Sequence, residues 1–252
     1  MKLVDQLTEL RHNVLRDFST QVSGATDQLW SDETLLGYIA DAEKMFCRRT
    51  MMLRDADTPQ ITQVTLLNGV SRYLLHPSIL SVISGRWNVD TFDLKRIGRT
   101  LVTDLAPDDT LFFDPSNYAP LSPGRPTAFS TDELLTFNQN AATALVVYPA
   151  PSPTEDQSTL YLRVARAPLR CYTLDDLDTA SEISDDYVYD VLEWAAYRAL
   201  RNHDVDAGDA ADASTHKTAF DDAVERAKRD LRSRLLSNTQ FLFGTNAFSW
   251  VR

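Results

Sequence analysis

The distribution of proline constrains the fold of this 252-residue chain more than any other feature of its sequence. All eleven prolines lie between Pro59 and Pro168. Because proline lacks the backbone N–H that a helix interior requires, residues 1–58 and 169–252 are free to be helical. The sequence therefore predicts two helical flanks around a middle of strands and turns.

Apolar residues recur at helical spacing in the first flank, where two helices are expected. Ser31 offers an N-cap before an acidic first turn, and the second helix is expected to run from there to about Thr50. The apolar stripe of the first helix consists of Val4, Leu7, Leu10, Val14, Leu15 and Phe18, and that of the second consists of Leu35, Ile39, Ala42 and Phe46.

Short β-rich runs separated by Gly- and Pro-containing turns occupy residues 60–170, so this part is predicted to be mostly sheet. Strands at 143–148 and 158–165 are predicted to pair as a hairpin. Residues 115–126, with four prolines, are expected to form an irregular surface loop.

Helical periodicity returns after Arg170. Two helices are predicted, joined by an exposed, acidic connection at 203–215. Acids at 221–225 precede bases at 228–234, which suits the dipole of a helix that begins near the acids. The buried stripe of the first helix is predicted to be Val188, Val191, Leu192, Ala195 and Ala199, and that of the second Phe220, Val224, Ala227, Leu231 and Leu235.

Short amphipathic helices cannot bury their apolar stripes alone, so the two flanks are expected to pack together as one bundle. The predicted fold class is α+β, with a discontinuous helical bundle that carries a β-rich inserted domain. The predicted boundaries are 1–58 and 172–236 for the bundle, 59–171 for the insertion and 237–252 for an extended C-terminal tail.

Composition excludes several classes of function. There are 25 Lys and Arg against 36 Asp and Glu, and the net charge of −11 argues against a protein whose main task is to grip nucleic-acid phosphates or anionic membranes. The two cysteines are too few for a disulfide framework, which favours a reduced intracellular chain. No apolar run approaches the roughly 18 residues of a membrane span, and the N-terminus does not have the pattern of a signal peptide.

No motif for catalysis, metal binding or nucleotide binding is present in the sequence. We therefore expect no catalytic residues, no metal site and no cofactor. An alternative left open is a hydrolase, or a carbohydrate- or peptidoglycan-binding protein, that uses the β-rich domain as its binding module.

Two segments stand out as candidate interaction sites. Eight acids and no Lys or Arg lie between Cys171 and Tyr197, either as a solvated approach to a helix or as a face that meets a basic partner or repels DNA. The tail from Ser237 to Arg252 has no acids and is rich in aromatic residues, which predicts that it is bound on the chain's own core or in a groove of a partner. Its aromatic residues include Phe241, Phe243, Phe248 and Trp250.

The order and character of these segments resemble the head-to-tail adaptor, or connector, proteins of tailed bacteriophages. The resemblance is carried by LWSDETLLGYIADAEKMFCRRT, by LYLRVARAPL leading into LDDLDTASEISDDYVYDVLEWAAYRAL, and by HKTAFDDAVERAKRDLRSRL. The insertion between Pro59 and Pro168 is longer than in the simplest all-helical adaptors. It suggests the larger type found in short-tailed phages, and a long-tailed phage stays open.

The resemblance implies a structural protein without enzymatic activity, made in the host cytoplasm and placed in the virion neck. About twelve copies would form a ring that joins the portal protein to a tail nozzle or tail-completion protein and continues the DNA channel without binding DNA specifically. The implied portal anchors are Phe241, Phe243, Phe248 and Trp250. On charge grounds, we further expect Asp175, Asp176, Asp185 and Asp186 to line the lumen or to meet, in a neighbouring copy, a basic face of Arg226, Arg229, Arg232 and Arg234.

Overall fold

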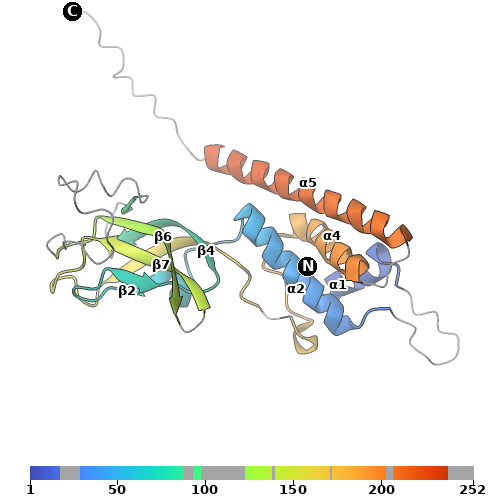
Figure 1. The fold of residues 1–252 in the computed structure, drawn as a ribbon, viewed down its shortest axis with the longest axis horizontal. Coiled ribbons are helices and arrows are strands. Elements are labelled where there is room, and N and C mark those ends of the chain that lie inside the picture. The colour runs from blue at the N-terminus through green and yellow to red at the C-terminus, as the bar shows by residue number, and fades with distance from the viewer. Residues whose placement is uncertain are drawn as a thin grey trace, which may run out of the picture. The chain divides into compact units, whose positions relative to one another are not determined.

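A computed structural model gives the structure of the chain, which contains two compact units (Figure 1). One unit, the helical unit, comprises Met1–Met52 and Cys171–Arg252, and the other, the strand-rich unit, comprises Leu53–Arg170. The mixture of helices and strands confirms the predicted α+β class. The structure describes residues 1–17, 29–87, 93–97, 123–137, 140–170, 172–202 and 207–237.

In the helical unit, helix α2 spans Asp32–Thr50, as predicted. The Ser31 hydroxyl accepts a hydrogen bond from the backbone N–H of Thr34 (3.2 Å), which satisfies one of the unpaired donors of the first turn. All four residues of the predicted apolar stripe of this helix are buried. The helix ends at Thr50, and the next residue, Met51, has a left-handed backbone conformation (φ 54°).

The first helix, α1, spans Leu3–Glu9 and continues as a π-helical turn, η1, over Leu10–Val14. The prediction that Val4 lies on the buried stripe is wrong, because its side chain is 37% exposed while Leu3 is buried. Backbone pairing sets this rotation, since the N–H groups of Leu3 and Val4 donate to carbonyls of Thr179 and Leu177 (both 2.9 Å). Phe18, also placed on that stripe, lies outside the described residues.

Two long helices complete this unit, α4 over Asp185–Asn202 and α5 over Ala207–Ser237. The predicted connection at 203–215 is wrong for most of its length, because α5 already begins at Ala207. Five alanines between 207 and 219 favour helix over an exposed loop. The acids at 221–225 consequently lie in the middle of α5 and not in its first turn.

Aromatic residues fill the core between α2, α4 and α5. Phe46 and Phe220 are almost completely buried, and their ring centroids lie 6.3 Å apart. The ring of Trp194 packs on Phe220 at 5.0 Å, and that of Tyr187 on Phe46 at 5.6 Å. The predicted stripe of α4 is buried throughout, whereas that of α5 is buried only as far as Ala227, because Leu235 is 43% exposed.

The strand-rich unit contains two four-stranded sheets. In the first sheet β8 is the centre and pairs antiparallel with three strands. Between β1 and β2 the chain makes a short helix, α3 (Pro59–Thr62), with proline at its first position, where no N–H is needed. The strands of this sheet are β1 (Arg54–Asp55), β2 (Gln63–Thr65), β4 (Ile79–Trp87) and β8 (Thr159–Arg166).

The second sheet has the order β3-β7-β6-β5, with β5 parallel to β6 and the other pairs antiparallel. Its strands are β3 (Arg72–Leu74), β5 (Lys95–Arg96), β6 (Ala128–Phe137) and β7 (Asn140–Tyr148). Of the loop predicted at 115–126, the structure describes only residues 123–126.

The predicted hairpin between 143–148 and 158–165 is wrong, because β7 and β8 belong to different sheets. The ten residues that connect them exceed the two to five of a usual hairpin loop, and three are prolines that cannot donate to a ladder. Residues 66–69 hold this connection through backbone bonds from Leu66 N to Ser158 O and from Gly69 N to Pro151 O (both 2.8 Å).

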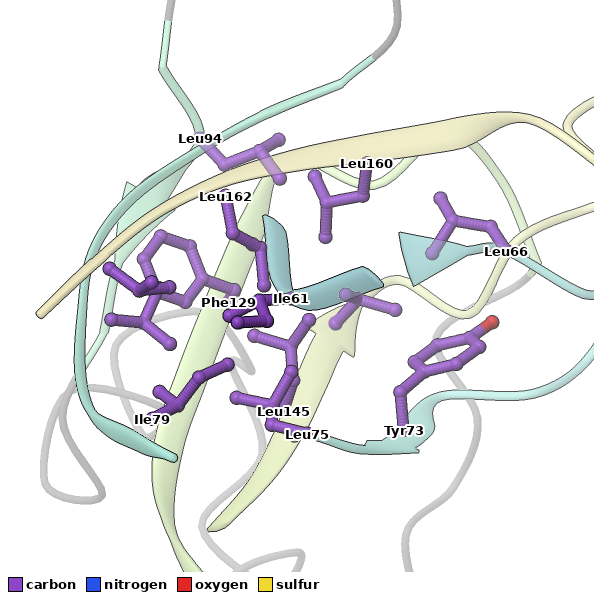
Figure 2. Close-up of a cluster of buried hydrophobic side chains, with 13 residues drawn as sticks. Ile61, Leu66, Tyr73, Leu75, Ile79, Leu94, Phe129, Leu145, Leu160 and Leu162 are labelled. Carbon is purple, nitrogen blue, oxygen red and sulfur yellow. The ribbon is translucent and has the colours of Figure 1, made fainter. Parts of the chain in front are cut away.

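The two sheets share one hydrophobic core (Figure 2). Leu160, Leu162 and Val164 enter it from β8, and Phe129 and Leu145 from the second sheet. Gly85 faces this core, and a Cβ at this position would lie 3.3 Å from the Leu162 side chain. The alternation of buried and exposed residues along β8 leaves the other face of the first sheet outside this core.

The two ends of the strand-rich unit are neighbouring strands, because β1 pairs with the end of β8. The buried carboxylate of Asp55 accepts hydrogen bonds from Arg166 Nε (2.6 Å) and from the N–H and hydroxyl of Thr58 (3.0 and 2.8 Å). Burial by itself would raise the pKa of Asp55, but these hydrogen bonds outweigh it and hold the pKa well below its usual range. The two ends of the unit are therefore held together by contacts between its own residues.

Candidate functional site

The acidic segment, defined here as residues 173–186, is anchored on the chain's own N-terminus. The N-terminal amine forms an ion pair with Asp185, and Lys2 Nζ pairs with Asp178 at 3.0 Å. Lys2 also forms a β-bridge with Ala180. The N-terminus and Lys2 therefore offset two of the negative charges in this segment.

Three further acids of this segment are exposed to solvent. Asp175 and Asp176 lie in a 3₁₀ turn (η3, Leu174–Asp176), and Asp186 lies in the first turn of α4, where the helix dipole favours a negative charge. All three are exposed, and none of them pairs with a cation among the residues that the structure describes. Leu174 and Tyr189, beside them, are 43% and 60% exposed. Exposed carboxylates next to exposed apolar side chains are suited to contact a partner.

Glu43 of α2 holds this segment onto the bundle. Its buried carboxylate accepts hydrogen bonds from the hydroxyls of Tyr172 and Ser181, the latter at 2.5 Å. Burial is the largest cause that raises the pKa of Glu43, and the nearby charge of Glu182 adds to it, while the hydroxyl donors oppose it. Glu43 was not predicted from the sequence, where its only signal is an acid on the buried side of an otherwise apolar helix face.

The raised pKa of Glu43 predicts a pH-dependent stability. Between the ordinary value of 4.5 and the higher value in the folded chain, the folded state holds a proton that the unfolded state has lost, so stability falls as pH rises through this window. Glu43→Gln should remove this dependence, so the wild type should lose stability relative to the variant across the window. Urea unfolding of both proteins at a series of pH values measures the difference. Exposed Glu33→Gln is the control, and a difference that is constant with pH would contradict the assignment.

The predicted basic face lies on the second half of α5, and all four of its arginines are exposed. Arg226 pairs with Asp190 of α4 in the same chain, so this guanidinium is already engaged. Tyr187 donates a hydrogen bond to Asp230 (2.6 Å), and burial together with this bond raises the pKa of Tyr187 to about 12. These contacts fasten α5 to α4, and Arg229 and Arg232 are exposed on the same half of the helix.

The last turns of α5 are exposed around the helix. Residues 232–235 are all exposed, among them Leu235, which the apolar periodicity placed in the core. A helix end that exposes arginines and a leucine directly before a segment rich in aromatic residues is typical of a surface that a partner contacts. The proposed tail anchors Phe241, Phe243, Phe248 and Trp250 lie outside the described residues.

A buried ion-pair cluster, also missed from sequence, fixes the start of α2. Arg11 of η1 pairs with Asp17 (2.6 Å) and with Asp32 (2.5 Å), and its guanidinium donates to the Trp30 carbonyl (2.9 Å). Asp17 in turn accepts from the backbone N–H of Leu29 (3.1 Å). The side chains of Arg11 and Asp17 are only 6% and 2% exposed, so water contributes little to stabilising either charge. Each charge is stabilised by its ion-pair and hydrogen-bond partners instead.

Within the described part of the chain, no helix is long and apolar enough to cross a bilayer, and no three potential metal ligands gather. His216 of α5 instead lies 2.6 Å from the carboxylate of Glu193 on α4. Cys47 is buried in α2, and Cys171 lies outside the described residues.

Comparison with known proteins gives one family. A family model described as SU10 adaptor protein matches residues 5–240, which cover both units. No curated protein matches the chain significantly.

Proposed function

The chain belongs to the SU10 adaptor family of bacteriophage structural proteins, and on that premise we propose that it forms a closed ring between the portal and the tail. About twelve copies make up this ring, which continues the DNA channel. The helical unit forms the body of the ring, and the strand-rich unit serves the tail side, where a nozzle or tail-completion protein binds. The protein acts in the virion neck by binding its neighbours and not by catalysis.

The exposed end of α5 is the observation that carries the portal side of this proposal. Arg229, Arg232 and Leu235 are exposed beyond Ala227, the last buried residue of α5 that the structure describes, and the aromatic tail follows within a few residues. Aromatic and arginine side chains are the residues that most often dominate binding energy at protein interfaces. The end of α5 and residues 237–252 therefore form one docking element for the portal.

The net negative charge of the chain supports its proposed role as a wall of the DNA channel. A net charge of −11 suits a wall that DNA passes without adhering, because like charges repel. The proposal assigns no specific DNA contact to the chain.

Removal of the tail tests the docking element. A chain that ends at Ser237 should lose portal binding by about a hundredfold or more, because several buried aromatic anchors are each worth about 2 kcal/mol or more. Binding to purified portal rings, read by native mass spectrometry and electron microscopy, measures this.

The matched variant for this test keeps the tail length and replaces Phe241, Phe243, Phe248 and Trp250 with serine. It should fail as the truncation does, whereas Leu67→Ser, at an exposed apolar residue outside the tail and the acidic segment, should bind normally. Undiminished portal binding by the truncated chain would move the docking site elsewhere, and a wild-type chain that does not bind portal rings would contradict the proposed function.

A further inference from the structure

The strand-rich unit has a basic surface that contains no residue of the proposed docking element for the portal. On β8, Leu160, Leu162 and Val164 point into the core, so Tyr161 and Arg163 lie on the opposite face of the sheet. The register places Arg86 of β4 opposite Tyr161, and Arg54 of β1 diagonally from Arg163. We name Arg54, Arg86, Tyr161 and Arg163 the arginine face.

The arginine face carries charge that the described chain does not compensate. Arg54, Arg86 and Arg163 form no ion pair or side-chain hydrogen bond with any residue that the structure describes, and Arg54 Nε is buried without an acceptor. Burial and the neighbouring Arg163 lower the pKa of Arg54, as expected for a cation held beside a like charge. Three unpaired arginines around a tyrosine that is 39% exposed have the composition of an interface centre.

We propose that the arginine face of one copy binds the acidic segment of the next copy in the ring, an inference that rests on the proposed function. A chain with a net charge of −11 repels its own copies, and a local contact of opposite charge offsets this repulsion where two copies meet. Asp175, Asp176 and Asp186 supply it, since they are exposed and have no cation partner in the described chain. Exposed Leu174 beside these acids and Tyr161 among the arginines provide the apolar centre.

This contact is heterologous, because each copy offers two different surfaces, and heterologous contacts are those that generate closed rings. Arginine suits the role, since its guanidinium binds carboxylates through paired hydrogen bonds. Nucleic-acid phosphates are the other ligand that arginines bind, and the experiment separates the two.

Reciprocal charge reversal tests the proposal. Variant A carries Arg86→Glu and Arg163→Glu, and variant B carries Asp175→Arg and Asp176→Arg. With either variant alone, the number of copies bound to portal rings should be at least about tenfold lower than with the wild type, because like charges then face each other. A mixture of A and B should recover assembly, because the negative face of A meets the positive segment of B and the positive face of B meets the negative segment of A.

Native mass spectrometry of the portal assemblies reads the result, and alternating A and B copies are expected in the mixture. Arg96→Glu and Asp222→Arg, two exposed charge reversals elsewhere, are the controls and should assemble normally. Normal assembly of A, or failure of the mixture, would overturn the inference. Loss of DNA binding by A without loss of assembly would overturn it in favour of a nucleic-acid contact. If the wild type itself does not assemble on the portal, the proposed function fails, which is a different outcome.

Discussion

Phe220→Ala is expected to lower the free energy of unfolding of the helical unit by about 3–5 kcal/mol, because it leaves a cavity at the centre of the bundle. Phe220 is fully buried on α5, and its ring packs on Phe46 of α2 and Trp194 of α4. The guanidinium of Arg49 lies over the same ring at 5.6 Å, so the loss also removes a cation–π contact.

Chemical denaturation, combined with hydrogen exchange read on peptides of the helical unit, measures this effect. The matched control is Tyr189→Ala, which removes an aromatic ring that is 60% exposed on α4 and should change stability by less than about 1 kcal/mol. Equal losses for the two variants would show that Phe220 does not lie in the core of the bundle.

Arg11→Leu is the second change with a large expected effect, a loss of about 3–5 kcal/mol. The substitution leaves the buried carboxylate of Asp17 without its cation and removes the donor to the Trp30 carbonyl. An unpaired buried charge costs more than the intact ion pair contributes, so the loss exceeds that of an ordinary surface salt bridge.

A second substitution distinguishes a buried charge from simple loss of packing. Arg11→Leu combined with Asp17→Leu should recover part of the lost stability, because the orphaned carboxylate is then absent. Arg48→Leu, at an exposed position of α2, is the control and should have little effect. No recovery in the double variant would contradict the assigned role of the pair.

The sequence predicted the helices more accurately than the sheets, and the reason is physical. The periodicity of α2 and α4 and the Ser31 cap depend on residues within a few positions of one another. The partner of a strand depends on distant residues, so 143–148 and 158–165 were predicted to pair although they lie in separate sheets. The start of α5 was misplaced because small and acidic residues at 203–215 suit a loop and a helix N-terminus alike.

The candidate surfaces, like the fold, could be predicted from the sequence only in part. The acidic segment and the basic half of α5 are visible as charge runs in the sequence, but their internal pairs, such as Arg226 with Asp190, require the tertiary structure. Glu43 and Arg11 could not be identified from the sequence, because a single charged residue in an apolar stripe does not show which residue it pairs with. The arginine face had a usable signal, since Tyr161 and Arg163 alternate with three core residues of β8.

Electron cryomicroscopy of portal rings bound to residues 1–252 tests whether the chain forms a ring between portal and tail. We expect a closed ring of many copies against the portal, with the helical units around the channel and density for residues 237–252 reaching into the portal. Chains bound singly, or a ring whose portal contact excludes the end of α5 and the tail, would contradict it.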